Sequence, residues 1–263
     1  MARTILDTEL NELHQQVINL GSLVSISLEY TLDAVERRDL ATCGLVLTLE
    51  TDIDKQRIRV EQYAFRLLTL QQPLGSRDLR FLLSCIAIAS DLERVGAGTK
   101  GIAQLFIRMA SLQRQVVHPI HKGRIPFKQK KTRKEAIFSA SAGIEASLIE
   151  ELVAFGQRPL SLLVRTMRAF AEQNMKVACT LWHEDDVIDT CYHILRHDML
   201  NFLEGSHALP ALQQDAFIIQ RVTYLLWMAH KLERMADHCT KICDRIVFIM
   251  QGKRNVPLYE KNL

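Results

Sequence analysis

The sequence predicts an all-α protein built of two tandem three-helix bundles that are related by an internal repeat. Apolar residues recur at three- and four-residue spacing almost everywhere, without sustained alternation, which is typical of helices. Only 11 Gly and 6 Pro occur in 263 residues, and this composition favours long helices over many short strands. A chain of this length also suits two modest domains better than one core.

The first half shows three helices. An apolar stripe runs from Leu13 to Val35 and ends near the sequence ERRD at 36–39. A second helix is expected over 40–70 and a third over 78–112. The segment QQPLGS at 71–76 separates them, with Pro and Gly for a turn and Ser76 as a helix cap. Because the connections are short, neighbouring helices should run antiparallel.

The second half repeats this order. Helices are expected over 160–172, from Asn174 to Leu203, and over 212–250. A separate helix over 135–157 should precede them, and Pro159 should end or kink it because proline lacks the backbone N–H that a helix needs.

The predicted domains are residues 1–115 and 135–263, the second with an extra leading helix, joined by a segment at 116–134. Seven basic residues and no acid lie in KGRIPFKQKKTRK at 122–134. The total net charge is +3, so the chain outside these seven charges carries −4. The molecule is therefore a mildly acidic body with one basic segment.

Sequence features favour a cytoplasmic protein. The N-terminus is charged and amphipathic, unlike a signal peptide or an anchor. The apolar run FLLSCIAIAS at 81–90 is stopped by Asp91, well short of the roughly 18 residues that a membrane span needs. The six cysteines contain no CxxC pair, so we expect reduced, mostly buried thiols: Cys43, Cys85, Cys179, Cys191, Cys239 and Cys243.

Both halves carry carboxylates at helical spacing beside apolar runs. The second helix of each half holds an acid-xxx-acid pair, and the third helix holds a glutamate after an apolar run, followed in one copy by an aspartate. The positions are Glu50 with Asp54, Glu93, Asp185 with Asp189, and Glu233 with Asp237. Like charges four residues apart on a helix repel by a few tenths of a kcal/mol unless a base or a bound cation compensates them.

Two interpretations of these acids remain open. In the first, bases compensate them, since Arg57 follows Asp54 by three residues and Lys241 follows Asp237 by four. In the second, the pairs converge on a metal ion. Small apolar neighbours on the third helices make an uncompensated charge costly, and carboxylates suit Mg, Mn, Fe or Zn. His193, four residues after Asp189, is a further candidate ligand, although it is better explained as a partner of Asp189.

Two stretches of the sequence resemble the signature of the PhoU family of phosphate-uptake regulators. QQPLGSRDLRFLLSCIAIASDLERVG at 71–96 contains its QP, DLR and LER elements in order. KLERMADHCTKICDRIVF at 231–248 is similar to the second copy of the same pattern. The similarity covers most of the chain as two repeats.

The resemblance implies a six-helix fold and multinuclear metal clusters. It implies a cytoplasmic regulator, peripheral to the inner membrane, that acts with the ATPase subunit of the phosphate ABC transporter and with a sensor histidine kinase. Such a protein lowers phosphate-regulon signalling when phosphate is plentiful, and we expect it to be a homo-oligomer, such as a dimer. The residues that match the metal motifs are Glu50, Asp54, Glu93, Asp185, Asp189, Glu233 and Asp237.

The first copy departs from this pattern. Ala97 stands where the family has an aspartate, and Gly98 replaces the histidine or similar residue that follows it. One metal site is therefore expected to lack a ligand.

Two other functions are weaker predictions. A ferritin-like di-metal oxidoreductase needs paired Glu-x-x-His motifs, and the chain has only Glu204 with His207, in a turn. The basic segment 122–134 could bind anionic lipid or nucleic acid, but Phe127 is its only aromatic residue and a solvated linker explains it as well. Without a Walker A motif, a GxSxG motif or an activated nucleophile, we expect no catalytic residues and no enzyme.

Overall fold

A computed structural model describes residues 2–70, 74–116, 133–204 and 217–252. Every regular element in these ranges is a helix, which confirms the all-α prediction. The helices are α1 (Ala2–Arg37), α2 (Leu40–Leu70), α3 (Ser76–Val116), α4 (Arg133–Ala171), α5 (Met175–Trp182), α6 (Asp185–Glu204) and α8 (Ile218–Gln251). The basic stretch at 122–132 lies outside the described residues. None of the helices described is both long and apolar enough to span a bilayer.

Helices α1 to α3 form the first unit where the sequence periodicity places them. The α1 stripe is fully buried at Leu13, Val17, Leu20, Val24 and Leu28. The turn into α2 passes through Arg38, whose φ of 56° lies in the left-handed region.

Asp39 caps the start of α2. Its carboxylate accepts a hydrogen bond from the Ala41 backbone N–H at 2.9 Å and one from the Thr42 hydroxyl at 2.6 Å. These bonds, that from Thr42 first, lower the pKa of Asp39. The cap fixes the point at which the chain reverses.

Pro159 was expected to end or kink a helix over 135–157, and the prediction that the helix ends there is wrong. One helix, α4, runs from Arg133 to Ala171 with Pro159 inside it, so there is no separate leading helix in the second unit. A proline inside a helix costs about 3 kcal/mol. Buried side chains on both sides of it, Leu152 and Phe155 before and Leu162 and Leu163 after, hold α4 in the core and offset that cost.

The helix expected from Asn174 to Leu203 is divided instead into α5 and α6. Asn174 caps α5 by accepting a bond from the Val177 N–H at 3.2 Å, and α5 ends at Trp182. Glu184 lies in the break and is held by the guanidinium of Arg165 on α4. Asp185 and Asp186 then open α6, where acidic residues favour a helix N-terminus.

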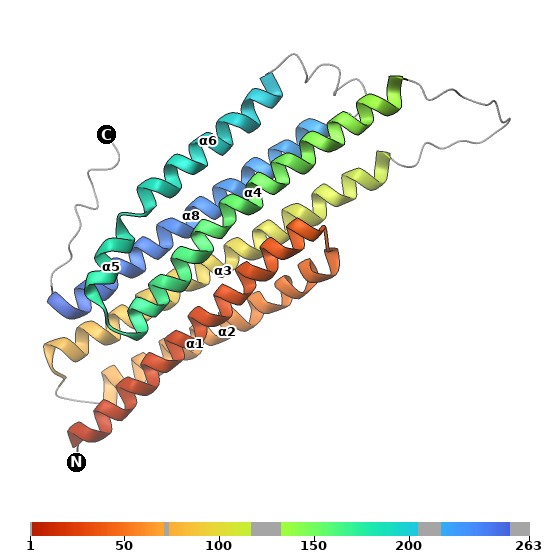
Figure 1. Cartoon of the computed structure of the whole chain (residues 1–263). Coiled ribbons are helices and arrows are strands. Elements are labelled where there is room, and N and C mark those ends of the chain that lie inside the picture. The colour runs from red at the N-terminus through yellow and green to blue at the C-terminus, as the bar shows by residue number, and fades with distance from the viewer. Residues whose placement is uncertain (1, 71–73, 117–132, 205–216, 253–263) are drawn as a thin grey trace.

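The two units pack along two pairs of helices. α3 lies against α8 and α1 against α4, while α2 covers one side of this group and α5 with α6 cover the other. The colours of Figure 1 show α3 and α8 running antiparallel side by side. A single hydrophobic core extends through both units. The domain limits inferred from the sequence stay a prediction, and the α3–α8 contact places the two LER motifs at the centre of the molecule.

Candidate metal-binding site

The structure brings together the four carboxylates predicted for the second unit. Asp185 begins α6 and Asp189 lies one turn later, while Glu233 and Asp237 are one turn apart on α8, which packs against α6. Asp185 is buried, Asp189 and Asp237 are half-buried, and the Glu233 side chain is 19% exposed. We call these four residues the second-unit acidic cluster.

Glu233 is influenced by the other three carboxylates of the cluster. Its pKa rises to about 7, first because the side chain is buried and then because of the negative charge of Asp237 and Asp189, with a smaller contribution from Asp185. Arg234 opposes the rise without cancelling it. The cluster is thus a place where negative charge is held at a cost, and a cation would relieve that cost.

Histidines near the cluster differ in position. The Nδ1 of His230 lies 3.1 Å from a carboxylate oxygen of Glu233, a neighbour that the sequence interpretation missed although the two are only three residues apart on α8. His193, considered as a ligand, is exposed, and its ring contacts the adjacent Tyr192. Within the described helices Asp237 forms no ion pair with Lys241, so the predicted compensation by that base is not present.

The first unit arranges its acids differently. Glu50 on α2 forms an ion pair with Lys100 on α3, in which the Glu50 Oε2 lies 3.0 Å from the Lys100 Nζ. Asp54 is paired with Arg57 at 3.0 Å, as the first interpretation predicted. Arg57 also binds Glu61 at 2.7 Å, and these bonds, that to Asp54 first, raise the pKa of Arg57. Compensation by bases therefore describes Glu50 and Asp54 in this unit.

Glu93 is half-buried on α3, followed one turn later by Ala97. The first unit therefore has no carboxylate at the position that corresponds to Asp237 in the second unit. The three acids Glu50, Asp54 and Glu93 are called the first-unit acidic set.

A test of fit to a divalent metal separates the two units. The second-unit acidic cluster contains four carboxylates, and burial together with their mutual repulsion raises the pKa of Glu233. Carboxylate oxygens are ligands that suit hard or borderline cations. In the first-unit acidic set, two of the three carboxylates already hold a lysine or an arginine. Among the described residues no three His, Cys, Asp or Glu side chains converge on one point, so metal binding would need the carboxylates of α6 and α8 to turn toward each other.

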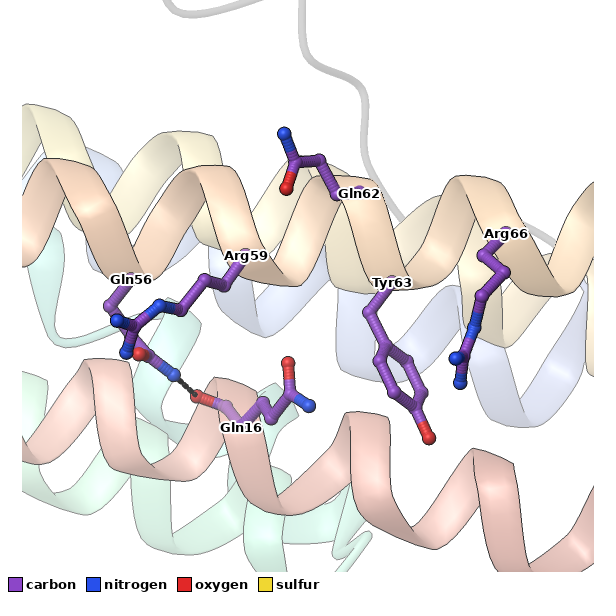
Figure 2. A pocket seen from close by; sticks show the side chains of 6 residues that line it. All are labelled: Gln16, Gln56, Arg59, Gln62, Tyr63 and Arg66. Carbon is purple, nitrogen blue, oxygen red and sulfur yellow. Dashed lines mark hydrogen bonds between the residues drawn. The ribbon is translucent and has the colours of Figure 1, made fainter.

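A polar groove lies apart from both acidic groups, between α1 and α2. It has a volume of about 430 Å³, and Figure 2 shows Tyr63 and Arg66 reaching from α2 toward α1 along it. Both donate to Glu9, at 2.6 Å and 2.8 Å, and the Arg66 guanidinium lies 4.5 Å from the centre of the Tyr63 ring. The bonds explain how α1 is fastened to α2, and none of the predicted metal ligands lines this groove.

A buried histidine–aspartate pair joins the two LER motifs, and the sequence interpretation missed it. The Nδ1 of His238 on α8 lies 2.9 Å from Oδ1 of Asp91 on α3, and both side chains are largely buried. His238 follows Asp237 and Asp91 precedes Leu92 and Glu93, so each motif supplies one member. Only the fold could reveal this pair, because the residues are 147 positions apart.

Comparison with known proteins gives one consistent result. The PhoU domain model matches residues 17–106 and 155–246, together more than half of the chain. A phosphate-specific transport system accessory protein PhoU homolog of Clostridium acetobutylicum is 22% identical over 97% of this chain and 98% of its own length. A protein with the same description from Streptococcus pneumoniae is 28% identical over 95% of this chain and 97% of its own.

Solved structures agree on the fold. The crystal structure of the phosphate transport system regulatory protein PhoU from Streptococcus pneumoniae superposes with a TM-score of 0.71 at 24% identity, over 95% of this chain and 98% of that one. PhoU from Pseudomonas aeruginosa gives 0.70 at 18% identity, over 94% and 99%. At these identities the structural likeness concerns the fold alone.

Proposed function

The chain belongs to the PhoU domain family, and from this premise we propose that it is an accessory regulator of phosphate transport. The observation that carries the proposal is the end-to-end match to relatives described as phosphate-specific transport accessory proteins, which includes both repeats. We assign it no reaction of its own.

The finer proposal concerns partners and place. The protein works in the cytoplasm, at the inner face of the membrane, with the ATPase subunit of a phosphate ABC transporter and a sensor histidine kinase, and it lowers phosphate-regulon signalling when phosphate is abundant. A homodimer is the proposed assembly.

The second-unit acidic cluster is proposed to bind a divalent or transition metal such as Mn, Fe, Zn or Mg. Asp185, Asp189, Glu233 and Asp237 would supply the ligands, with His230 beside Glu233. When bound, the metal would neutralise carboxylates that otherwise repel each other and so would fasten α6 to α8. The raised pKa of Glu233 supports this role.

The regulatory proposal is tested by deleting the gene from its own host and measuring a phosphate-regulon reporter in phosphate-rich medium. The reporter should rise in the deletion and return to its repressed level with the wild-type chain. Co-purification from phosphate-replete and phosphate-starved cells, with mass spectrometry of retained proteins, should recover the transporter ATPase or the kinase. An unchanged reporter together with neither partner would contradict the proposal.

The alternatives stay predictions. His207, half of the only Glu-x-x-His motif, and the basic stretch 122–132 lie outside the described residues, so the structure tests neither a ferritin-like oxidoreductase nor lipid or nucleic-acid binding. Oxygen consumption by protein loaded with ferrous iron would revive the first. Unchanged retention on liposomes and DNA after deletion of 124–133 would remove the second.

A further inference from the structure

The internal repeat allows each base near the first-unit acidic set to be compared with its counterpart in the second unit. Second helices align with an offset of 135 residues and third helices with an offset of 140, as Glu50 to Asp185 and Glu93 to Glu233 show. Under these offsets Arg57 corresponds to Tyr192, and Lys100 corresponds to Thr240. The two bases that pair with Asp54 and Glu50 therefore correspond to neutral residues in the second unit.

The packing of α2 against α3 explains why Lys100 reaches Glu50. The backbone of Gly96 lies against Ile53, since a Cβ on Gly96 would meet the Ile53 side chain at 3.0 Å. One turn beyond Gly96 on antiparallel α3 lies Lys100, and about one turn before Ile53 on α2 lies Glu50. Their 3.0 Å ion pair, with side-chain exposures of 37% and 23%, is thus built into the helix register.

The same face of α3 carries Glu93, Ala97 and Lys100, which are spaced four and three residues apart. A lysine ammonium has three donors and no lone pair, so it can neutralise a carboxylate but cannot ligate a metal. It also repels a cation that approaches the carboxylate it holds. Where the second unit places the carboxylate of Asp237, this face has only a methyl group.

We propose that Lys100, assisted by Arg57, takes the place of a metal ion in the first unit, so that the first-unit acidic set binds no divalent cation. The negative charge of the carboxylates is then neutralised by lysine and arginine in the first unit and by a bound metal ion in the second. This inference rests on the proposed metal binding by the second-unit acidic cluster, and its tests are chosen so that the two can fail separately.

The first test measures where metal binds. The full chain is dialysed against Mn²⁺, washed, and analysed for bound metal, alongside Asp189→Asn/Glu233→Gln and the same double variant with Glu50→Gln added. The double variant should hold less than a tenth of the wild-type Mn²⁺, and exposed Glu29→Gln should change nothing. If the double variant retains Mn²⁺ and the triple variant does not, Glu50 binds metal and the inference is overturned. If the double and triple variants retain the same small amount, the first unit binds no metal, as proposed.

The second test needs no metal. In chelator, Lys100→Gln should lower the melting temperature by roughly 1–3 °C, since it leaves Glu50 uncompensated. In a Glu50→Gln background the same change should cost clearly less, while in the Glu29→Gln background it should cost as much as in the wild type. Equal losses in all three backgrounds would overturn the inference. If the wild-type chain binds no Mn²⁺ at all, the metal binding in the proposed function fails. The melting temperatures of the Lys100 and Glu50 variants then decide by themselves whether Lys100 neutralises Glu50.

Discussion

At the scale of single residues, the molecule holds two kinds of carboxylate. Glu50 and Asp54 have lysine or arginine partners within 3.0 Å. Glu233 instead has three acids nearby, with His230 in contact at 3.1 Å, and its pKa is raised to about 7. A group whose folded pKa exceeds its ordinary value binds more protons in the folded state. Its contribution to stability is complete below the unfolded pKa of about 4.5 and is lost as the pH rises through 7.

The stability of Glu233→Gln should therefore depend on pH less than that of the wild type. In chelator at pH 8, the variant should have a free energy of unfolding about 1–3 kcal/mol higher than the wild type, because it no longer holds a charge in the second-unit acidic cluster. At pH 4.5 the two should be nearly equal. Urea denaturation at pH 4.5, 6, 7 and 8 measures the difference, and a gap that does not change with pH would refute the pKa assignment.

Cysteine environments also follow from burial. Burial raises the pKa of Cys43 to about 11 and that of Cys243 to about 12, and it raises those of Cys85 and Cys239 as well. Cys179 and Cys191 are half-buried. Four of the six cysteines are buried, which agrees with the prediction of mostly buried thiols, while their reduced state stays a prediction.

A thiol reagent such as DTNB should consequently label two cysteines quickly and four only after unfolding, because the thiolate is the reactive form. Replacing Cys179 and Cys191 with serine should abolish the fast phase while leaving the slow one. Six equivalent rates in the native protein would contradict the burial described here.

At the scale of helices, sequence periodicity was sufficient to locate α1, α2, α3 and the described part of α8. Periodicity and local propensity gave wrong helix boundaries where contacts with other helices determine the structure. Pro159 is a helix breaker by itself, but the buried residues around it keep α4 continuous. The break between α5 and α6 was missed, and the contact found there, between Glu184 and Arg165 nineteen residues earlier, joins two helices and cannot be read from local periodicity.

The candidate site shows the same division. Spacing along a helix was enough to propose Asp185, Asp189, Glu233 and Asp237. The Lys100–Glu50 pair could not be predicted in this way, since its members lie on different helices and their contact depends on how α2 and α3 are aligned. The i,i+4 spacing of two carboxylates can be read from the sequence of one helix. Whether a carboxylate contacts a base or another acid depends on which residues the neighbouring helix places beside it.

Glycines on two helices provide a prediction about packing. Gly44 is exposed on α2 with nothing within 4 Å of an added Cβ, so Gly44→Ala should raise the free energy of unfolding by about 0.5–1 kcal/mol. Gly156 on α4 faces Leu32 of α1, where an added Cβ would lie 2.4 Å from a methyl carbon. Gly156→Ala should lower stability by about 1–3 kcal/mol. Denaturant unfolding of both variants measures this, and a stabilised Gly156→Ala would show that α1 and α4 are less closely packed.

At the scale of the whole molecule, the two units share one hydrophobic core through the α1–α4 and α3–α8 contacts. The buried pair of His238 with Asp91 lies within this junction. We therefore expect the repeats to unfold together, although each resembles a separate three-helix bundle in sequence.

Ile53→Ala tests this coupling, because Ile53 is buried within the first unit, between α2 and α3. The change should cost about 2–5 kcal/mol, and amide hydrogen exchange should accelerate as much in the middle of α8 as in the middle of α1. Ile58→Ala, at an exposed position on the same helix, is the control. Faster exchange confined to α1, α2 and α3 would mean that the units unfold independently.

The close contact between Gly98 and Met235 links the two repeats at a position where the first repeat has no side chain. A Cβ at position 98 would lie 2.6 Å from the terminal methyl of Met235, so the space above Gly98 belongs to the other repeat. Any side chain at position 98 would therefore require the flexible end of Met235 to move. The gap left by the missing side chain of one repeat is filled by a methionine of the other, so a change at position 98 would be felt across the interface between the two units.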